Sequence, residues 1–258
     1  MVNKQKAISI LSAAGVPDPA FEWRQMQQAA KSEEQLIQML HRRTQREPLQ
    51  YILGEWDFFD MTLSLGPGVL CPRPETEFVV EQALALIPAK KALDLCAGTG
   101  CMGLAVARFT PDCQVDAIEL SKEAMPYLLK NIAKYGDGRV RPHQGDVLSW
   151  ADRLPGASVD LIVCNPPYID PSLQGKLMPE VQQEPDMALF APNKGLYFYQ
   201  QIIPLYKRVL RPGGIMVFEI GFDQRQAVQK LFFQNGYVNV GAAEDYSGND
   251  RVVWGYAP

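Results

Sequence analysis

The chain has 258 residues, 47% of them hydrophobic, and a formal net charge of -4. This length predicts one large domain with a smaller second one, and the apolar content is enough for a sizeable core. The acidic balance argues against a surface that coats nucleic acid, so we expect no direct nucleic-acid binding. No apolar run approaches the ~18 residues of a membrane span, and no charged-then-apolar signal segment opens the sequence. We therefore expect a cytoplasmic protein without membrane contacts.

Cysteine and histidine usage excludes several kinds of active site. The cysteines are odd in number and lack CxxC spacing, which is typical of buried thiols in a reducing compartment. They are Cys71, Cys96, Cys101, Cys113 and Cys164. His41 and His143 are the only histidines, too few for a histidine metal site or a Ser-His-Asp triad. We expect no metal ion.

The first 48 residues are expected to form a small helical domain. Ala7 and Leu11 follow helical spacing in a first helix. Pro19 is suited to the first turn of a second helix, and Ser32–Gln35 is a capping-box pattern before a third. Residues 1–48 are thus predicted to be a helical bundle.

Residues 49–73 are expected to form a β-hairpin linker. Phe58, Met61 and Leu63 are apolar residues close to the turn signal Gly66-Pro67-Gly68. The segment therefore separates the bundle from the rest of the chain.

Residues 74–258 are predicted to form an α/β domain. Pro74 should open a helix that runs to about residue 87. Beyond it we expect strands at 92–95, 115–120, near 140, at 159–164 and 215–220, helices at 102–109, 122–135, 196–210 and 224–235, and a closing hairpin of 237–240 with 252–256. This alternation predicts a mostly parallel sheet covered on both faces, with an antiparallel hairpin at one edge.

The run Asn165-Pro166-Pro167-Tyr168 directly follows the strand predicted at 159–164. Proline has no backbone N–H, and it forces the preceding residue into an extended conformation. Asn165 should therefore end the strand with its amide held out, and the carbonyls of Asn165 and Pro166 should lack ladder partners. A plain rigid loop is the alternative.

These acceptors suit a planar NH2 group that is about to be alkylated. An amide nitrogen is a weak nucleophile because its lone pair is delocalised, so a protein can help mainly by holding it in line. The side-chain oxygen of Asn165 and the carbonyl of Pro166 would accept the two N–H groups, and Tyr168 would pack against the planar substrate. Their dipoles would also favour positive charge that grows on nitrogen.

A second group of residues predicts a nucleoside site. Asp94 to Gly100 links a strand to a helix through a glycine-containing turn. Glu119 ends the next strand, where an acid can bind ribose hydroxyls, and Asp146 follows the third strand, where it can accept from an adenine amino group. The full dinucleotide fingerprint and the triphosphate P-loop are both missing, so S-adenosylmethionine fits best. A solvated strand end for Glu119 and a helix cap for Asp146 are the alternatives.

Together these motifs resemble the class I S-adenosylmethionine-dependent methyltransferases, and more narrowly the bacterial-type enzymes that methylate N5 of glutamine in peptide chain release factors. The matching segments are Arg46–Gly54, Val69–Glu77 with its Pro-Arg-Pro-Glu-Thr-Glu run, Asn165–Ile169, Glu184–Pro185, Ala188–Leu189, Gly195–Leu196 and Gly248–Val253. The resemblance covers nearly the whole chain.

The resemblance implies a Rossmann-like, seven-stranded sheet and a set of site residues. The cofactor's methionine end would lie along Cys96, Ala97, Gly98, Thr99 and Gly100. Glu119 would bind the ribose, Asp146 and Val147 would edge the adenine, and Asn165 would lie next to the cofactor. The glutamine amide would be held by Asn165, Pro166, Pro167 and Tyr168, with S-adenosylhomocysteine as the product.

The implied partner is a release factor that presents its Gly-Gly-Gln loop, with the bundle of residues 1–48 as a recognition domain for its body. We also expect a monomer. Arg73 is open to two interpretations, a pair with an acid in the hinge or a contact to substrate. Glu75 likewise favours its helix N-terminus or touches the substrate.

One departure from the family pattern concerns Cys96, which stands where the family usually has glycine. We expect its backbone to avoid a strongly left-handed conformation. Three other functions stay open: a ribosomal-protein glutamine methyltransferase, a nucleic-acid adenine-N6 methyltransferase, and a catalytically silent adaptor that binds a release factor or the ribosome. The acidic charge opposes the nucleic-acid enzyme, and the Pro72–Glu77 signature opposes both enzymes.

Overall fold

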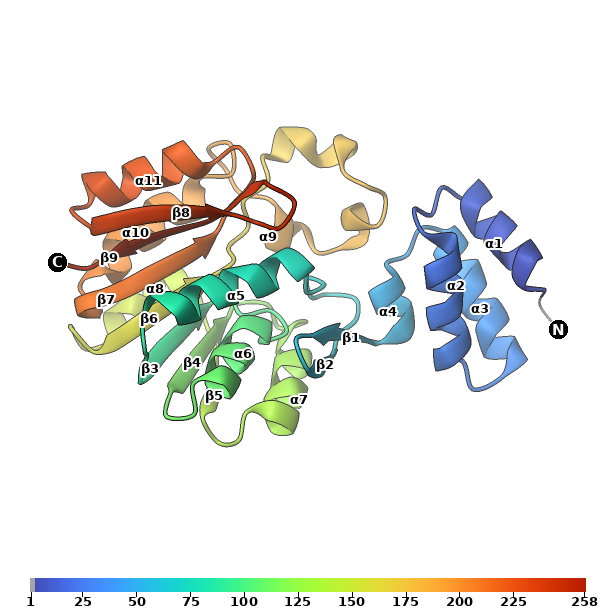
Figure 1. Cartoon of the computed structure of the whole chain (residues 1–258), viewed down its shortest axis with the longest axis horizontal. Helices are drawn as coiled ribbons and strands as arrows, with labels where there is room; N and C mark the ends of the chain where they lie inside the picture. Colours follow the sequence, from blue (N-terminus) through green and yellow to red (C-terminus); the bar gives the residue numbers. More distant parts are fainter. Residues whose placement is uncertain (1–2) are drawn as a thin grey trace.

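The computed structural model describes residues 3–258. Figure 1 shows a helical bundle at one end, the sheet domain at the other, and a short helix and hairpin between them. Within residues 3–258, no helix is both long and apolar enough to cross a membrane.

The bundle consists of α1 (Lys4–Ala13), α2 (Pro19–Ala29) and α3 (Glu33–Thr44). Polar caps start the helices: the side chain of Asp18 accepts from the backbone N–H of Phe21 at 3.0 Å, and that of Ser32 accepts from Gln35 at 3.2 Å. The fully buried ring of Trp23 packs at the centre of the bundle's own apolar core. This core is separate from those of the sheet domain.

The linker contains α4 (Leu49–Leu53) and a hairpin of β1 (Glu55–Phe58) and β2 (Met61–Ser64). Asn131 fastens this hairpin to the sheet domain. Its side-chain oxygen accepts from the Ser64 N–H at 2.7 Å, and its NH2 group donates to the carbonyls of Ser64 and Thr99 at 3.0 and 2.9 Å. Asn131 is fully buried, so these bonds satisfy a polar group that would otherwise be costly.

The sheet has seven strands in the order β5-β4-β3-β6-β7-β9-β8. The strands are β3 (Lys91–Leu95), β4 (Gln114–Glu119), β5 (Val140–Gln144), β6 (Val159–Cys164), β7 (Leu210–Glu219), β8 (Val238–Glu244) and β9 (Asp250–Tyr256). The first five run parallel, and β9 pairs antiparallel with both β7 and β8. This confirms the predicted α/β class, the seven strands and the antiparallel edge.

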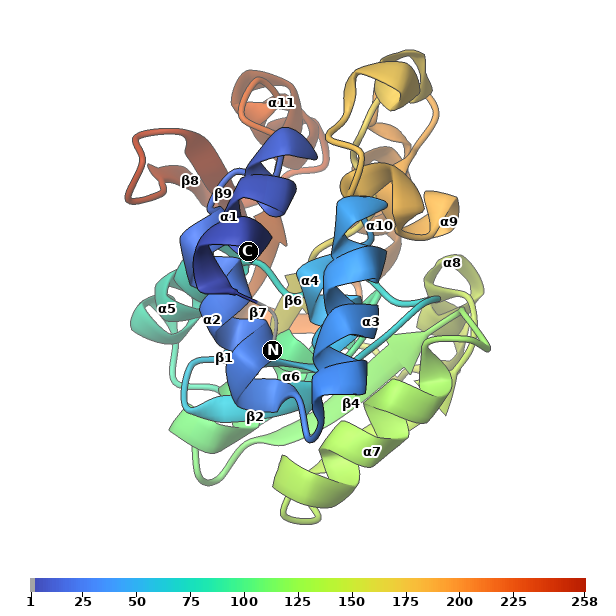
Figure 2. The same cartoon turned by 90° about the vertical axis from the view of Figure 1, so that its right-hand side faces the viewer.

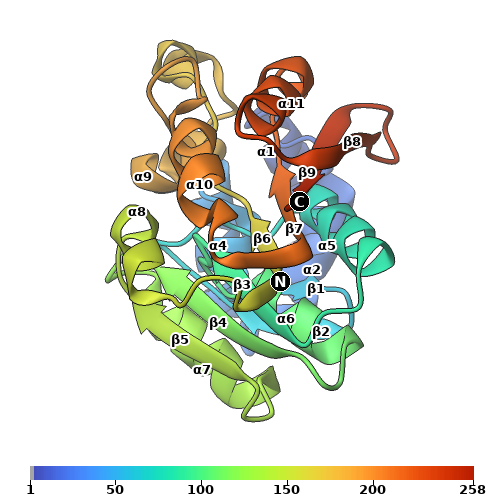
Figure 3. The ribbon, with the colours of Figure 1, turned by 90° about the vertical axis from the view of Figure 1, so that its left-hand side faces the viewer.

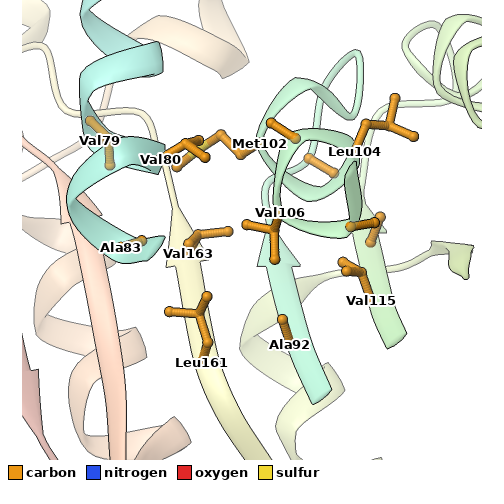
Figure 4. Packing of buried hydrophobic residues seen from close by; sticks show 14 of the residues in the cluster. Val79, Val80, Ala83, Ala92, Met102, Leu104, Val106, Val115, Leu161 and Val163 are labelled. Carbon is orange, nitrogen blue, oxygen red and sulfur yellow. The ribbon is translucent and has the colours of Figure 1, made fainter. Parts of the chain in front are cut away.

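Helices cover both faces of the sheet (Figure 3). The longer ones are α5 (Pro74–Leu86), α6 (Cys101–Phe109), α7 (Met125–Tyr135), α10 (Tyr197–Lys207) and α11 (Arg225–Gln234). Figure 4 shows side chains of α5 and α6 packed on one face of β3, β4 and β6. In β6, Leu161 and Val163 face this layer, whereas Ile162 and Cys164 face the opposite one. Burial on both faces explains the continuous apolar run of β6.

Several elements differ from the sequence-based predictions. Helix α7 begins at Met125 rather than at residue 122, and β7 begins at Leu210 rather than at residue 215, so that it includes Pro212 and the two glycines after it. A register shift between β6 and β7 accommodates them. The short helices α8 (Val147–Trp150), η1 (Ala151–Arg153), η2 (Pro171–Lys176), η3 (Val181–Gln183) and α9 (Asp186–Leu189) were not predicted.

An ion cluster around the buried Arg43 joins the bundle to the segment that follows β6. Glu180, just before η3, accepts from Arg46 at 2.8 and 2.6 Å and from Arg43 at 2.6 Å. Arg43 also pairs with Glu22 of α2. Figure 2, seen from the bundle end, shows α3 and α4 in front of the sheet. Because Arg43 is buried, and a buried charge that loses its partners costs roughly 3–5 kcal/mol, its pairs with Glu22 and Glu180 restrict movement of the bundle against that segment.

Candidate active site

Two loops leave the carboxyl ends of adjacent strands at the same level. Leu95 of β3 and Cys164 of β6 are register partners, so the glycine loop (Cys96–Gly100) and the proline loop (Asn165–Tyr168) begin side by side. The chain order also reverses between these strands, since β4 and β5 continue on one side and β7 on the other. Open α/β sheets bind ligands at such a reversal.

A cavity lies over this point and contains about 920 Å³ of atom-free space, counting the part open to solvent. Its wall includes nine of the predicted site residues: Cys96, Ala97, Gly98, Thr99, Glu119, Asp146, Val147, Asn165 and Pro167. Five others are not part of the wall: Arg73, Glu75, Gly100, Pro166 and Tyr168. The structure therefore brings the predicted nucleoside residues and Asn165 to one cavity.

The glycine loop turns back on itself through left-handed residues. Cys96, Gly98 and Gly100 have φ angles of +62°, +55° and +81°. The expectation that Cys96 avoids this region was wrong. The loop is held in place because the Ala97 N–H donates to the Ile118 carbonyl of β4 at 3.0 Å. These contacts offset the ~1–2 kcal/mol that a left-handed conformation costs a residue with a Cβ.

Glu119 ends β4 and ties the glycine loop to the next turn. Its two carboxylate oxygens accept from the backbone N–H groups of Gly98 at 2.7 Å and Ser121 at 2.6 Å. The side chain is buried but borders the cavity. A carboxylate has about four acceptor positions, so lone pairs stay available to hydroxyl groups of a ligand.

Asp146 is the helix cap considered from the sequence, and its contact with adenine stays a prediction. Its Oδ1 accepts from the Leu148 N–H at 2.9 Å and so caps α8, and it also lines the cavity beside the buried Val147.

Asp94 is a further cavity residue, one that the sequence reasoning named without giving it a role. It is almost fully buried, and its Oδ2 accepts from the Gly103 N–H at 2.8 Å. Burial raises the pKa of Asp94 to about 7, and the Gly103 N–H opposes this shift.

In the proline loop, Asn165 presents unpaired acceptors beside the cavity. Its Nδ2 lies 3.5 Å from the Thr76 hydroxyl, whereas its Oδ1 has no hydrogen-bond partner within residues 3–258. The backbone carbonyls of Asn165 and Pro166 also accept no bond from the described part of the chain. The sequence predicted these free acceptors, because prolines interrupt the ladder.

Tyr168 anchors the other end of the proline loop. Its hydroxyl donates to Glu219 at 3.1 Å, and its carbonyl accepts from the Gln224 amide at 2.9 Å. Burial raises the pKa of Tyr168 above its ordinary value. Gly195 packs so closely that an added Cβ would lie 1.9 Å from the Tyr168 carbonyl oxygen. The ring of Tyr168 packs against the core layer that includes side chains of α10 and α11.

Thr76 and Glu219 are site residues that sequence reasoning missed. Thr76 lies in the first turn of α5 and lines the cavity, and its hydroxyl donates to Glu219 at 2.6 Å. Burial raises the pKa of Glu219, while hydrogen bonds from Thr76 and Tyr168 and the nearby charge of Arg251 oppose the shift. Glu219 could have been found from the sequence, because it is an acid at the end of the strand next to β6.

Arg73 and Glu75 lie at the start of α5. Arg73 pairs with the buried carboxylate of Glu184, which also accepts from the Cys71 N–H at 3.0 Å. The sequence predicted, as one of two interpretations, an ion pair with an acid in the hinge, but Glu184 lies outside the linker, between η3 and α9. Glu75 is exposed in the first helical turn.

Comparisons with known proteins identify the chain as a methyltransferase. The Methyltransferase small domain family matches residues 74–182. A methyltransferase structure from Pyrococcus furiosus shares the fold with a TM-score of 0.59 at 19% identity, over 77% of this chain and 90% of that one. The hMettl16 catalytic domain, solved in complex with MAT2A 3'UTR hairpin 1, shares it with a TM-score of 0.62 at 17% identity, over 86% and 79%.

Curated relatives narrow the family. A protein from Salmonella typhimurium named release factor glutamine methyltransferase is 39% identical, over 86% of this chain and 80% of its own length. A protein of the same name from Caulobacter vibrioides is 37% identical, over 95% of this chain and 92% of its own length. The relative of that name from Escherichia coli is 35% identical over 86% of this chain and 80% of its own. The chain belongs to the release factor glutamine methyltransferase family.

Proposed function

We propose that the protein transfers a methyl group from S-adenosylmethionine to the side-chain nitrogen N5 of the glutamine in the Gly-Gly-Gln motif of peptide chain release factors. The name carried by its relatives supports this substrate. The observation that carries the proposal is the pair of free acceptors at the start of the proline loop: the Oδ1 of Asn165, which lines the cavity, and the carbonyl of Pro166, the next residue in the chain.

The chemistry of the cavity wall fits the cofactor, because the wall combines apolar side chains with the carboxylates of Glu119 and Asp146. The glycine loop would follow the methionine end, Glu119 would accept from the ribose hydroxyls, and Asp146 with Val147 would edge the adenine. When bound, S-adenosylmethionine supplies an electrophilic methyl group on a positively charged sulfur and leaves as S-adenosylhomocysteine.

Asn165 and Pro166 would hold the glutamine amide. Each oxygen accepts one N–H of the substrate, which fixes the plane of the amide and turns its nitrogen toward the methyl group. Alignment of this kind is worth up to ~7–11 kcal/mol. As the nitrogen gains positive charge, the two carbonyl dipoles stabilise it more than they stabilised the neutral amide. Pro167 stiffens the loop, and a stacking role for the Tyr168 ring stays a prediction.

The division of the chain follows the same proposal. Residues 1–48 would bind the body of the release factor, residues 49–73 would act as the linker, and residues 74–258 would carry out methyl transfer. Contacts of Arg73 and Glu75 with the substrate stay predictions, as do the monomeric state and the lack of nucleic-acid binding.

Mass spectrometry tests the substrate directly. Purified protein and S-adenosylmethionine are incubated separately with a release factor, ribosomal proteins and adenine-containing DNA. We expect one added methyl group, on the Gly-Gly-Gln peptide only. A release factor with glutamate in place of that glutamine is the matched control, because it keeps the shape but lacks the N–H groups. Methylation of DNA or ribosomal protein instead would contradict the proposal.

Calorimetry with S-adenosylmethionine separates the enzyme from a silent adaptor. An enzyme binds the cofactor in the cavity, whereas the adaptor would give no binding heat. Absence of binding would leave only the adaptor.

A further inference from the structure

Glu219 is a buried acid that the mechanism above does not use. It ends β7, its side chain is 2% exposed, and the register of Phe218 with Cys164 puts it level with Asn165 on the neighbouring strand. Within residues 3–258 it forms no salt bridge. Two hydroxyls contact it instead, from Thr76 at 2.6 Å and Tyr168 at 3.1 Å. A buried acid without an ion pair is costly, so its position requires an explanation.

Thr76 connects Glu219 to Asn165. A threonine hydroxyl has one proton to donate and lone pairs that accept. Here the proton goes to the Oε2 of Glu219, which leaves the lone pairs to face the Nδ2 of Asn165 at 3.5 Å. This second bond is long, as bonds in ligand-free sites often are. The hydrogen bonds therefore run in one direction, from Asn165 to Thr76 to Glu219.

This direction decides which end of the Asn165 amide faces the substrate. The oxygen and the NH2 group of an asparagine have nearly the same shape, and only their partners distinguish them. With its NH2 group on Thr76, Asn165 presents its oxygen as an acceptor. In the opposite orientation it would present N–H donors to the N–H donors of a substrate amide, and the two groups could not pair.

We propose that Glu219 is a positioning residue that acts through Thr76 to fix the hydrogen-bond direction of Asn165, so that the Asn165 oxygen faces the substrate. The catalytic consequence rests on the proposed function, whereas the amide orientation is a property of the protein alone. In Glu219→Gln the new NH2 group can donate to Thr76. The threonine proton is then free to turn toward Asn165, and both amide orientations become accessible.

Steady-state kinetics test the catalytic consequence. We expect Glu219→Gln and Thr76→Val to lower kcat by about 10-fold to 100-fold, in line with the loss of one positioned group, with KM for S-adenosylmethionine within about twofold of wild type. Thr76→Ser keeps the hydroxyl and should retain near wild-type kcat. If Thr76 had only a structural role, the kcat values of Thr76→Ser and Thr76→Val would not differ in this way.

Tyr199→Phe is the matched control. The Tyr199 hydroxyl donates to the backbone carbonyl of Glu219 at 2.9 Å, so this variant loses a buried hydrogen bond at the same residue. It leaves the three-residue chain intact and should keep kcat near wild type. Equal losses of kcat in Tyr199→Phe and Glu219→Gln would overturn the proposal.

An NMR measurement reads the orientation without turnover. We expect an NOE between the side-chain NH2 protons of Asn165 and the Thr76 side chain in the wild type, and its loss or marked weakening in Glu219→Gln. An unchanged NOE in that variant, or wild-type kcat in both Glu219→Gln and Thr76→Val, would overturn the inference. If the wild type does not methylate a release factor, the proposed function fails, and the NOE still decides the orientation.

Discussion

The glycine loop and the proline loop begin side by side at the cavity, yet their backbones differ in conformation and in hydrogen bonding. The glycine loop bends through three left-handed residues, so its backbone can approach a ligand closely. The proline loop instead leaves the carbonyls of Asn165 and Pro166 without partners among the described residues, and its prolines have no N–H groups of their own. We therefore expect changes in the first loop to alter cofactor affinity and stability, and changes in the second to alter turnover.

Asn165→Ala should give the largest effect. It removes one of the two acceptors that hold the substrate amide, so kcat should fall by about 100-fold to 1,000-fold. Calorimetry should find cofactor affinity within a few-fold of wild type, because the cofactor wall is otherwise complete. Wild-type turnover in this variant would contradict the role given to the proline loop.

Gly195→Ala should displace the proline loop, although Gly195 itself lies outside that loop. Its φ is +80°, and the new Cβ would lie 1.9 Å from the Tyr168 carbonyl oxygen, so the loop must shift. Gly248→Ala is the matched control, since its φ is +78° and its new Cβ would meet nothing within 4 Å.

We expect urea unfolding to give a loss of about 1 kcal/mol for Gly248→Ala, from the left-handed backbone alone. Gly195→Ala should lose about 3 kcal/mol and also lower kcat, because overpacking adds to the backbone strain. Equal losses in the two variants would show that the contact with Tyr168 does not matter.

Asp94, directly before the glycine loop, should make stability depend on pH. The unfolded chain ionises Asp94 near pH 3.8, whereas the folded protein holds its proton up to about pH 7. The folded state thus binds more protons in this window, and its free energy of unfolding falls as pH rises through it.

Asp94→Asn keeps an acceptor for the Gly103 N–H and removes the titration. Between pH 5 and 7 the stability of this variant relative to wild type should therefore rise by about 2 kcal/mol. Urea unfolding at several pH values measures the difference, in which other titrating groups cancel. A difference that does not change with pH would refute the raised pKa.

Cys96→Gly should give the smallest effect and the opposite sign. Glycine relieves the left-handed strain at φ +62°, but it also gains freedom in the unfolded chain, so stability should rise by at most about 1 kcal/mol. Thermal unfolding and calorimetry check this. A clear loss of stability would mean that packing of the Cys96 side chain outweighs the strain.

Local signals were sufficient to predict much of this molecule. Strand β6 has the bounds predicted for it, because its apolar run ends at an asparagine before two prolines. The same pattern predicted the free carbonyls of the proline loop. The mostly parallel sheet and its antiparallel edge hairpin were also predicted from the alternation of elements along the chain, whereas the strand order was not.

The contacts that could not be predicted from the sequence join residues that are far apart along the chain. Thr76 and Glu219 are 143 positions apart, and no local pattern pairs a hydroxyl with an acid across that separation. The left-handed Cys96 was missed because propensity favours glycine there, whereas contacts with β4 decide the conformation. The short helices between residues 171 and 189 lack a periodic signal that is long enough to read.

The ion cluster around Glu180 fixes the distance between the helical bundle and the proline loop. Glu180 belongs to the segment that continues from the proline loop, and its carboxylate is gripped by Arg43 and Arg46 of the bundle side. The spacing between the bundle and the amide acceptors is thereby set before any substrate arrives. If the bundle binds the release factor as proposed, the factor must project its glutamine by a matching length, and reach as well as chemistry would then select what is methylated.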